Sequence, residues 1–391
     1  MKQLRGFKYR LYPTEEQKIL LAKHFGACRW MYNYALSKKI AYYTTEKKTL
    51  SRFEIQRELV ELKKQEATSW LSEVNSQSLQ ASLVNLDKAY TRFFREKKGF
   101  PKFKSKKGRQ SVQFPQGTEV DFENNKIYLM KFREGVKCKF HRMFEGAIKT
   151  VTVSKTKTGK YYVSILVETD VPEKQKPVPK IDKAMGIDLG ITSFLVTSNE
   201  HKFENPKFLK KSLEKLQREQ RRLSCKKKGG KNRDKQRLKV AKLHEKVANQ
   251  RKDFLHKVSR HLVDDNQVNT YCIETLNVQG MMRNHCLAQS IADSGWHTFA
   301  EFLKYKAEGA GKNVLQIGRF EPSSKVCNVC GLINSKLSLK DRIWVCDCDA
   351  EHDRDINAAR NIRDFAFAKQ NLLGQGLPEV TPGETEDYLG R

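Results

Sequence analysis

The sequence predicts a multidomain α+β chain: a β module interrupted by helices, followed by an α/β domain with a small cysteine-rich insertion. Three observations predict this class. Strand-like alternation at the N-terminus gives way to helical spacing and returns between residues 111 and 169. A Pro/Lys-rich stretch at 171–180 then separates this module from buried strands and basic helices. Finally, four of the nine cysteines lie within residues 327–348.

Composition bounds the possible functions. The chain has 391 residues, enough for two to three domains, and carries 75 Lys and Arg against 45 Asp and Glu, a formal charge of +30. Such an excess needs a polyanion, with nucleic acid the first candidate and an anionic membrane surface the second. No run of about 18 apolar residues and no secretory leader is visible. We therefore expect a cytoplasmic protein.

The first half predicts a β module with a helical insert. Residues 4–12 alternate like a strand that Pro13 ends, and Thr14 with Gln17 forms a capping box that opens a helix. Further helices are expected over residues 51–64 and 76–97. Strands follow from 111 to 169, with a Thr158-Gly159 turn. The predicted β module is 1–13 plus 101–172, with the insert at 14–100.

The second half begins after a linker at 173–180. Its expected elements are a strand, tight turn and strand over 183–198, a basic helical hairpin at 206–260, a buried strand at 268–276, a helix at 288–308, a strand at 313–320 and a helix over 355–369. The α/β domain is predicted as 181–326 plus 351–370, the cysteine insertion as 327–350 and a mobile tail as 371–391. This order of elements is the ribonuclease-H-like plan.

The cysteine insertion predicts a structural zinc site. Cys327 and Cys330 have the spacing of a zinc knuckle, and Cys346 and Cys348 complete four thiolates, the set that tetrahedral zinc prefers. The second pair is one residue short, although alternate strand residues point the same way. His352 could replace one of these cysteines. The alternative is four free, reduced cysteines.

Three acidic residues lie in, or at the end of, elements that are otherwise apolar. Asp188 lies in an apolar strand, Glu274 ends the strand Tyr-Cys-Ile-Glu, and Asp355 opens the last helix. A buried, unpaired carboxylate costs several kcal/mol, so a metal, a basic partner or a capping role must compensate it. Capping the turn is the alternative for Asp188, and helix capping is the alternative for Asp355, with Asp353 as competitor. Together the acids suit two Mg²⁺ ions that hydrolyse a polynucleotide.

Two basic stretches predict contacts to nucleic acid. The hairpin holds 21 Lys and Arg against 5 Asp and Glu over residues 206–260, and Arg221 and Arg222 are its candidate phosphate contacts. A solvated surface is the alternative. Residues 91–110 interleave Lys102 and Lys104 with phenylalanines that could stack on bases or could complete the core of the preceding helix.

These motifs together resemble the transposon-encoded TnpB (OrfB) family, which is related to compact type V CRISPR effectors. The resemblance covers about residues 4–370 and rests on FKYRLYPTEEQ, FGACRWMYN, GIDLG, YCIETL, SIADSGW, PSSKVCNVCG and WVCDCDAEHDRDINAARNI. The chain departs from the family pattern at the second cysteine pair, which is shorter than C-x-x-C, and at Asp349, where glycine often stands.

The resemblance implies an RNA-guided DNA endonuclease of a prokaryote, which would be associated with the nucleoid when it is bound to DNA. It implies a split β-barrel with a helical recognition insert, then a RuvC-type nuclease domain interrupted by a zinc ribbon. The family's catalytic triad falls on Asp188, Glu274 and Asp355, which selects Asp355 over Asp353. A transposon-derived guide RNA would choose double-stranded target DNA by base pairing, and the protein would read a short flanking motif. The helix from Ser76 matches the recognition segment, and there Gln77 and Gln80 could pair with adenine.

Three other functions compete with this interpretation. GIDLGITS resembles the first strand of ATP-binding enzymes of the actin and sugar-kinase type, but no second phosphate loop or adenosine site is visible. An RNA-guided repressor without cleavage would lack one of the acids, and all three are present. A transposase that performs strand transfer would use the same carboxylate chemistry. The resemblance instead assigns mobilisation to a separate transposase.

Overall fold

The computed structural model describes residues 2–369 except 173, 266, 320 and 339. The chain divides into two compact units, Met1–Glu173 and Lys174–Arg391, each of which has its own sheet and core. The predicted tail at 371–391 lies outside the described residues.

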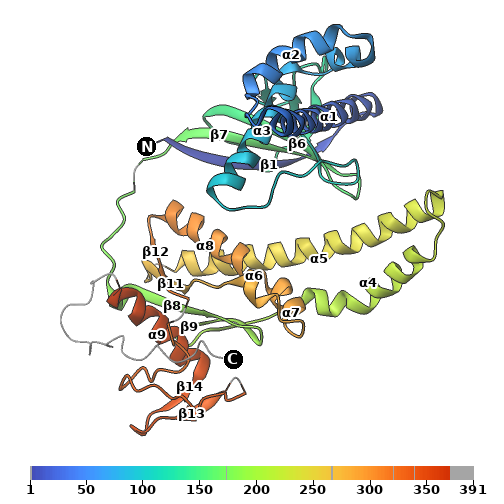
Figure 1. The fold of residues 1–391 in the computed structure, drawn as a ribbon. Coiled ribbons are helices and arrows are strands. Elements are labelled where there is room, and N and C mark those ends of the chain that lie inside the picture. Colours follow the sequence, from blue (N-terminus) through green and yellow to red (C-terminus); the bar gives the residue numbers. More distant parts are fainter. Residues whose placement is uncertain (1, 173, 266, 320, 339, 370–391) are drawn as a thin grey trace. The chain divides into compact units, whose positions relative to one another are not determined.

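The first unit is built on a seven-stranded antiparallel sheet in the order β2-β6-β7-β1-β5-β4-β3 (Figure 1). Its strands are β1 (Lys2–Tyr12), β2 (Gln110–Phe114), β3 (Glu119–Asp121), β4 (Lys126–Tyr128), β5 (Val136–Lys139), β6 (Ala147–Lys155) and β7 (Tyr161–Asp170). The N-terminal strand therefore occupies the middle of the sheet and pairs with β7 from Lys2↔Asp170 to Leu11↔Tyr161.

This sheet has to curl. Strands β2 and β3 lie at its opposite edges, yet only four residues separate Phe114 from Glu119. Five steps along an extended chain reach at most about 18 Å. A flat sheet of seven strands would measure about 29 Å across at ~4.8 Å per strand. The two edges are consequently drawn toward each other, and the apolar side chains on the inner face form one core with the helices.

The helices of this unit lie between β1 and β2 in sequence, as predicted for an insert. They are α1 (Glu15–Glu46), α2 (Arg52–Lys64), the 3₁₀ segment η1 (Glu66–Glu73) and α3 (Ser76–Arg95). The predicted capping box is confirmed: Thr14 accepts from the Gln17 amide and the Gln17 side chain accepts from the Thr14 amide. In the described part of the chain no helix, long α1 included, is apolar enough over a sufficient length to cross a membrane.

The second unit contains a five-stranded mixed sheet in the order β10-β9-β8-β11-β12 (Figure 1). Its strands are β8 (Ala184–Leu189), β9 (Ser193–Thr197), β10 (Lys202–Glu204), β11 (Thr270–Glu274) and β12 (Asn313–Ile317), and the short 3₁₀ turn η2 (Ile181–Lys183) precedes them. Strands β8, β9 and β10 form an antiparallel meander, whereas β8, β11 and β12 run parallel. The predicted strand, turn and strand over 183–198 correspond to β8 and β9.

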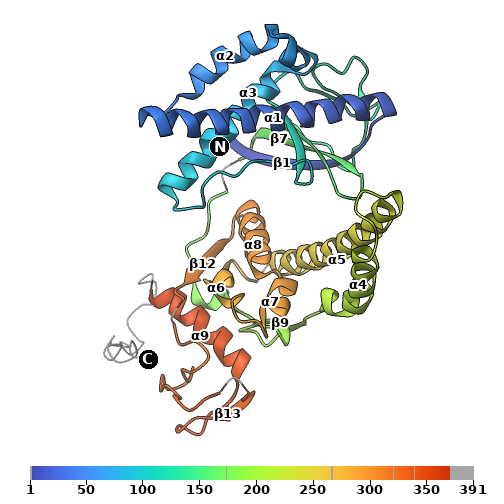
Figure 2. The same cartoon turned by 45° about the vertical axis from the view of Figure 1, so that its right-hand side comes forward.

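The predicted basic hairpin consists of α4 (Phe208–Ser224) and α5 (Lys231–Asp264), which extend away from the sheet (Figure 2). Gly229 has φ +85° in the turn between them, a conformation that favours glycine. The single helix expected over 288–308 is wrong. Two helices, α7 (Ala288–Ser294) and α8 (Trp296–Ala310), follow the short α6 (Val278–Met281) and meet at Gly295, whose φ of +71° interrupts the helical path.

The C-terminal part of the second unit combines a small ribbon with the last helix. Strands β13 (Ile343–Val345) and β14 (Glu351–Asp353) pair antiparallel, and α9 (Arg354–Ala368) follows directly. Figure 1 shows α9 lying along the sheet beside β8, with the ribbon at its N-terminal end. One face of α9 packs on a core that includes Cys272, Leu315 and Ile317.

Candidate functional site

Two of the predicted acids lie side by side at the ends of parallel strands. Asp188 is the penultimate residue of β8, and Glu274 is the last residue of β11. The parallel register pairs Ile187 with Ile273, so Asp188 and Glu274 occupy the next position on each strand. Both acids are thereby carried to the same edge of the sheet.

The third acid arrives through an unusually close contact between α9 and β8. A Cβ atom on Gly186 would lie only 1.8 Å from the carbonyl oxygen of Ala359, so only glycine fits there. Asp188 follows Gly186 by two residues and shares its strand face, which is the face toward α9. Asp355 precedes Ala359 by four residues and shares its helix face. The contact therefore brings Asp355 to Asp188.

Asp353, and not Asp355, caps the helix. The Asp353 carboxylate accepts from the amides of Asp355 and Ile356, each at 3.1 Å, and its second oxygen receives Lys202 Nζ at 2.6 Å. Helix capping therefore cannot account for Asp355. Its carboxylate is left available at the start of α9.

The electrostatics of the three acids favour a bound cation. Burial raises the pKa of Asp188 to about 7, and the Asp355 and Glu274 carboxylates add to the rise while Arg354 opposes it. Burial also raises the pKa of Glu274. By the accessible surface of the whole residue, all three acids are half-buried. Hard divalent cations such as Mg²⁺ bind carboxylate oxygens, so this donor set fits them and a bound cation would relieve the repulsion.

Sequence reasoning missed two arginines beside these acids. Asp355 Oδ1 lies 3.5 Å from Arg342 Nη1 and 3.8 Å from Arg354 Nε. The Arg342 side chain also donates to Thr192 Oγ1 at 3.2 Å, in the turn after β8. Arg342 belongs to the ribbon, between the two cysteine pairs, where one Arg in a basic chain gives no sequence signal.

The four predicted cysteines form one cluster. Their sulfur atoms all lie within 4.8 Å of one another, with Cys327 3.8 Å from Cys348 and Cys330 3.5 Å from Cys346. Four thiolates at about 2.3 Å from one zinc ion lie about 3.8 Å apart along the edges of a tetrahedron. The cluster therefore fits zinc. Across the described residues no other set of three metal-binding side chains gathers as closely.

The short half-site is accommodated by its turn. Gly331 after the first pair has φ +80°, and Asp349 after the second pair has φ +62°, the left-handed conformation that Asp adopts more readily than most residues. His352 lies beside this cluster without belonging to it. Its Nε2 atom is 3.0 Å from Cys327 Sγ, and its ring packs on Trp344 across the β13–β14 pair. Substitution of a cysteine ligand by His352 is therefore not needed.

The candidate nucleic-acid contacts lie on several surfaces. The Gln77 side chain donates a hydrogen bond to Gln116 Oε1 at 3.0 Å. Gln80, on the same helix α3, is half-buried. Lys104 lies 3.7 Å from the centre of the Tyr32 ring, and Lys102 is exposed. On α4, exposed Arg221 neighbours Arg222, which donates to Glu219 at 2.9 Å. Their roles in binding remain predictions.

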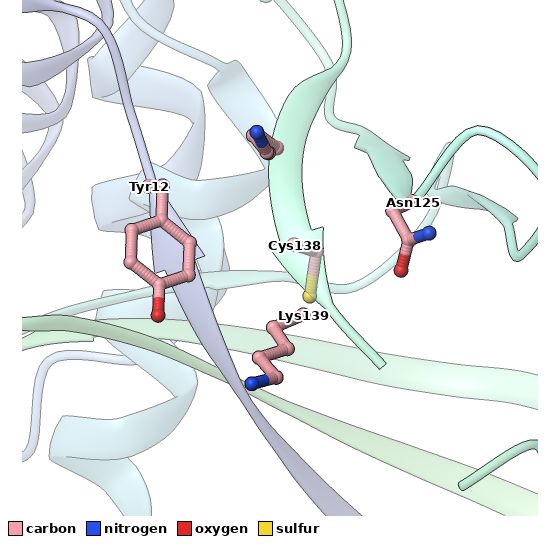
Figure 3. Close-up of a pocket in the computed structure, with 5 residues that line it drawn as sticks. Tyr12, Asn125, Cys138 and Lys139 are labelled. Carbon is pink, nitrogen blue, oxygen red and sulfur yellow. The ribbon is translucent and has the colours of Figure 1, made fainter. Parts of the chain in front are cut away.

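Two hollows of the first unit are lined by cationic and amide side chains. One, of about 550 Å³, lies among α1, α3 and β2 and includes Arg29, Asn85 and Lys104. The other, of about 410 Å³, is lined by Tyr12, Asn125, Lys137, Cys138 and Lys139 (Figure 3). Both hollows have cationic side chains in their lining, together with apolar groups.

Three family models match parts of the chain. Residues 164–285 match a family model described as a probable transposase, 296–362 one described as a Cas12f1-like TNB domain, and 1–48 one described as a helix-turn-helix domain. Over that last range the structure has strand β1 and the single long helix α1, with no turn between two helices.

Full-length relatives match as well. A protein of Streptomyces pristinaespiralis provisionally named RNA-guided DNA endonuclease is 40% identical over 95% of this chain and 92% of its own length. The provisionally named RNA-guided DNA endonuclease InsQ of Escherichia coli is 33% identical over 93% and 92%. Among solved structures, a Cas12f1–sgRNA–target DNA complex matches with a TM-score of 0.57 and 14% identity, covering 93% of this chain and 99% of that one, which indicates a shared fold.

Proposed function

Because the chain belongs to the transposon-encoded TnpB (OrfB) family, we propose that it is an RNA-guided, metal-dependent DNA endonuclease that cuts double-stranded DNA beside a short flanking motif. The observation that carries the proposal is the convergence of Asp188, Glu274 and Asp355 from two strands and a helix. The charge of +30 supports polyanionic partners. A separate transposase would mobilise the element.

We assign the second unit to the ribonuclease-H-like RuvC plan. An antiparallel meander, two added parallel strands and a helix packed on the central strand support this assignment. The ribbon at 327–350 would be the zinc ribbon that interrupts the domain. In the first unit, the curled sheet supports a split β-barrel, with residues 14–100 as the recognition insert.

The carboxylates would hold two Mg²⁺ ions, which when bound activate a water molecule and stabilise the leaving 3′ oxygen. The chain's own residues prepare this site. Gly186 permits the contact that carries Asp355 to Asp188, and Asp353 fixes the first turn of α9. Arg342 places a positive charge 3.5 Å from Asp355, where it would attract the phosphate to be cut.

The basic surfaces suit a protein that binds nucleic-acid backbones and leaves target selection to a guide RNA. Base pairing to a guide RNA derived from the transposon end would select the target, so the protein needs positive charge along the backbones more than base-reading side chains. The α4–α5 hairpin and the two hollows of the first unit supply such surfaces. Gln80 on α3 is our candidate for reading the flanking motif.

Cleavage assays with guide-loaded protein test the nuclease. Asp188→Ala, Glu274→Ala and Asp355→Ala should each abolish cutting in Mg²⁺ while sparing binding of guide RNA and target, because binding depends on basic surfaces elsewhere. Asp353→Ala is the matched control: losing a helix cap costs about 1 kcal/mol of stability, so substantial cutting should remain. Cutting by Asp188→Ala, or undiminished cutting by the parent in chelator, would refute the mechanism.

A further inference from the structure

Helix α9 is held on a second face by the first cysteine knuckle. Asn357 Nδ2 donates to the Val326 carbonyl at 2.7 Å. Asn361 Nδ2 donates to the Val326 and Ser323 carbonyls, also at 2.7 Å. Val326 directly precedes Cys327, so two α9 side chains bind the backbone that leads into the cysteine cluster.

The knuckle returns these hydrogen bonds through Asn328, which lies between the two cysteines of the first pair. Its amide donates to Asn357 Oδ1 at 2.9 Å. Its side chain donates to Asn361 Oδ1 at 3.3 Å and to Asp364 Oδ2 at 2.8 Å. Asn357 and Asn361 are only 1% and 2% exposed, so both are shielded from solvent and both side-chain amides are paired at each end.

The same helix thus touches the cysteine cluster on one face and the carboxylates on another. Asp355 lies in its first turn, two residues before Asn357. Its other anchors at that end also come from the ribbon: the Arg354 amide donates to the Arg342 carbonyl at 2.8 Å, and its side chain donates to the Ser338 and Asp341 carbonyls. The ribbon therefore contributes to the position of Asp355, in addition to the contact between α9 and β8.

We propose that Asn357 and Asn361 are positioning residues that couple the two metal sites: zinc in the cysteine cluster strengthens divalent-cation binding by Asp188, Glu274 and Asp355. The inference rests on the proposed function. The ribbon has two three-residue strands and a core of little more than Cys327, Trp344 and Cys346, so the metal has to supply most of its order. Since coupling is reciprocal, a cation at the carboxylates also strengthens zinc binding.

Mn²⁺ binding to the zinc-loaded full chain, measured by electron paramagnetic resonance, tests the coupling without DNA or RNA. Asn357→Ala acts from the helix and Asn328→Ala from the knuckle. Each should keep one zinc per chain and raise the Mn²⁺ dissociation constant about fivefold or more, the low end of typical coupling between sites. Cleavage by the guide-loaded variants should need correspondingly more Mg²⁺. Asn334→Ala is the matched control, because the Asn334 side chain accepts from the Lys336 amide inside the ribbon and is not part of the network that joins the knuckle to α9.

The outcomes separate this inference from the proposed function. Parent protein that binds Mn²⁺ no better than Asp355→Ala would count against the carboxylate site itself. If parent binding depends on Asp355 and both asparagine variants match it with zinc in place, the coupling is wrong. Loss of zinc from both variants would also overturn the proposed coupling. The asparagine network would then be needed to form the zinc site itself and would not transmit zinc binding to the carboxylates.

Discussion

At the scale of single residues, the hydrogen bonds of His24 determine which protonation state of its ring the folded protein favours. His24 is fully buried in α1. Its Nε2 atom accepts from the Asn75 amide at 3.1 Å, so Nδ1 carries the proton and donates to the Leu20 carbonyl at 2.8 Å. A second proton on Nε2 would face the Asn75 N–H. The folded structure therefore favours the neutral form of the His24 imidazole.

This arrangement predicts acid sensitivity of the first unit. Burial lowers the pKa of His24 below the usual ~6.5, so its contribution is complete above pH 6.5 and is lost as pH falls from there toward the folded-state pKa. The loss approaches about 1.4 kcal/mol per pH unit in that window. Denaturation of His24→Gln between pH 7.5 and 5 should show a shallower decline. His297→Gln, which removes an exposed imidazole, should decline like the parent, and an equal decline in all three would disprove the assignment.

At the scale of elements, the packing of α9 on β8 sets the geometry of the site. The contact is made at backbone level, where Gly186 meets the carbonyl of Ala359. Neighbouring small side chains, Ala358 and Ala359, are buried along the same helix. A strand and a helix at this distance leave no room for adjustment, so any added atom displaces the helix and Asp355 with it.

Two glycine-to-alanine changes in the second unit should act in opposite directions. Gly186→Ala should destabilise this unit by about 1–3 kcal/mol through overpacking and should abolish cleavage. Gly309→Ala, on α8 with nothing within 4 Å of the new Cβ, should stabilise by about 0.5–1 kcal/mol because alanine favours the helix. Thermal denaturation and cleavage assays measure both. Full cleavage by Gly186→Ala would contradict the close contact.

Sequence reasoning found the acids but not the scaffold that gathers them. Asp188 and Glu274 stand out because an acid in an apolar strand is costly. Asp355 could be separated from Asp353 only by the family pattern, until the structure identified Asp353 as the cap. Gly295 gave no clear break signal, because one glycine within a helical pattern is usually tolerated. Asn357 belongs to the family motif but had no assigned role, and Arg342 gave no signal, because the partners of both residues lie far away in sequence.

At the scale of the whole molecule, the charge of +30 is spread over both units. The hairpin carries 21 Lys and Arg against 5 Asp and Glu over residues 206–260, and most of these cations are exposed. Arg222 pairs with the buried Glu219 carboxylate, which also accepts from the Gln236 side chain at 2.6 Å and so keeps a partner when Arg222 is replaced. The hairpin can therefore lose positive charges without losing its fold.

Salt dependence of guide-RNA binding measures how many phosphates the hairpin contacts. Arg221→Gln with Arg222→Gln should reduce the slope of log affinity against log salt by about 1–2, roughly one for each phosphate that the protein no longer neutralises. Lys47→Gln with Lys48→Gln, the same charge change at the exposed end of α1, is the control and should alter the slope less. Equal slopes for both pairs and the parent would mean that the hairpin is only a solvated surface.

The central place of β1 in its sheet has a consequence for synthesis. The first strand leaves the ribosome long before either neighbour, since β5 ends at Lys139 and β7 at Asp170. At about 5–20 residues per second, β1 waits roughly 8–30 s for β7, whereas the helices between them are complete much earlier. An unpaired strand exposed for that time is a target for wrong pairing or for chaperones. Until β7 has been synthesised, β1 is therefore a segment of this chain that is prone to aggregation.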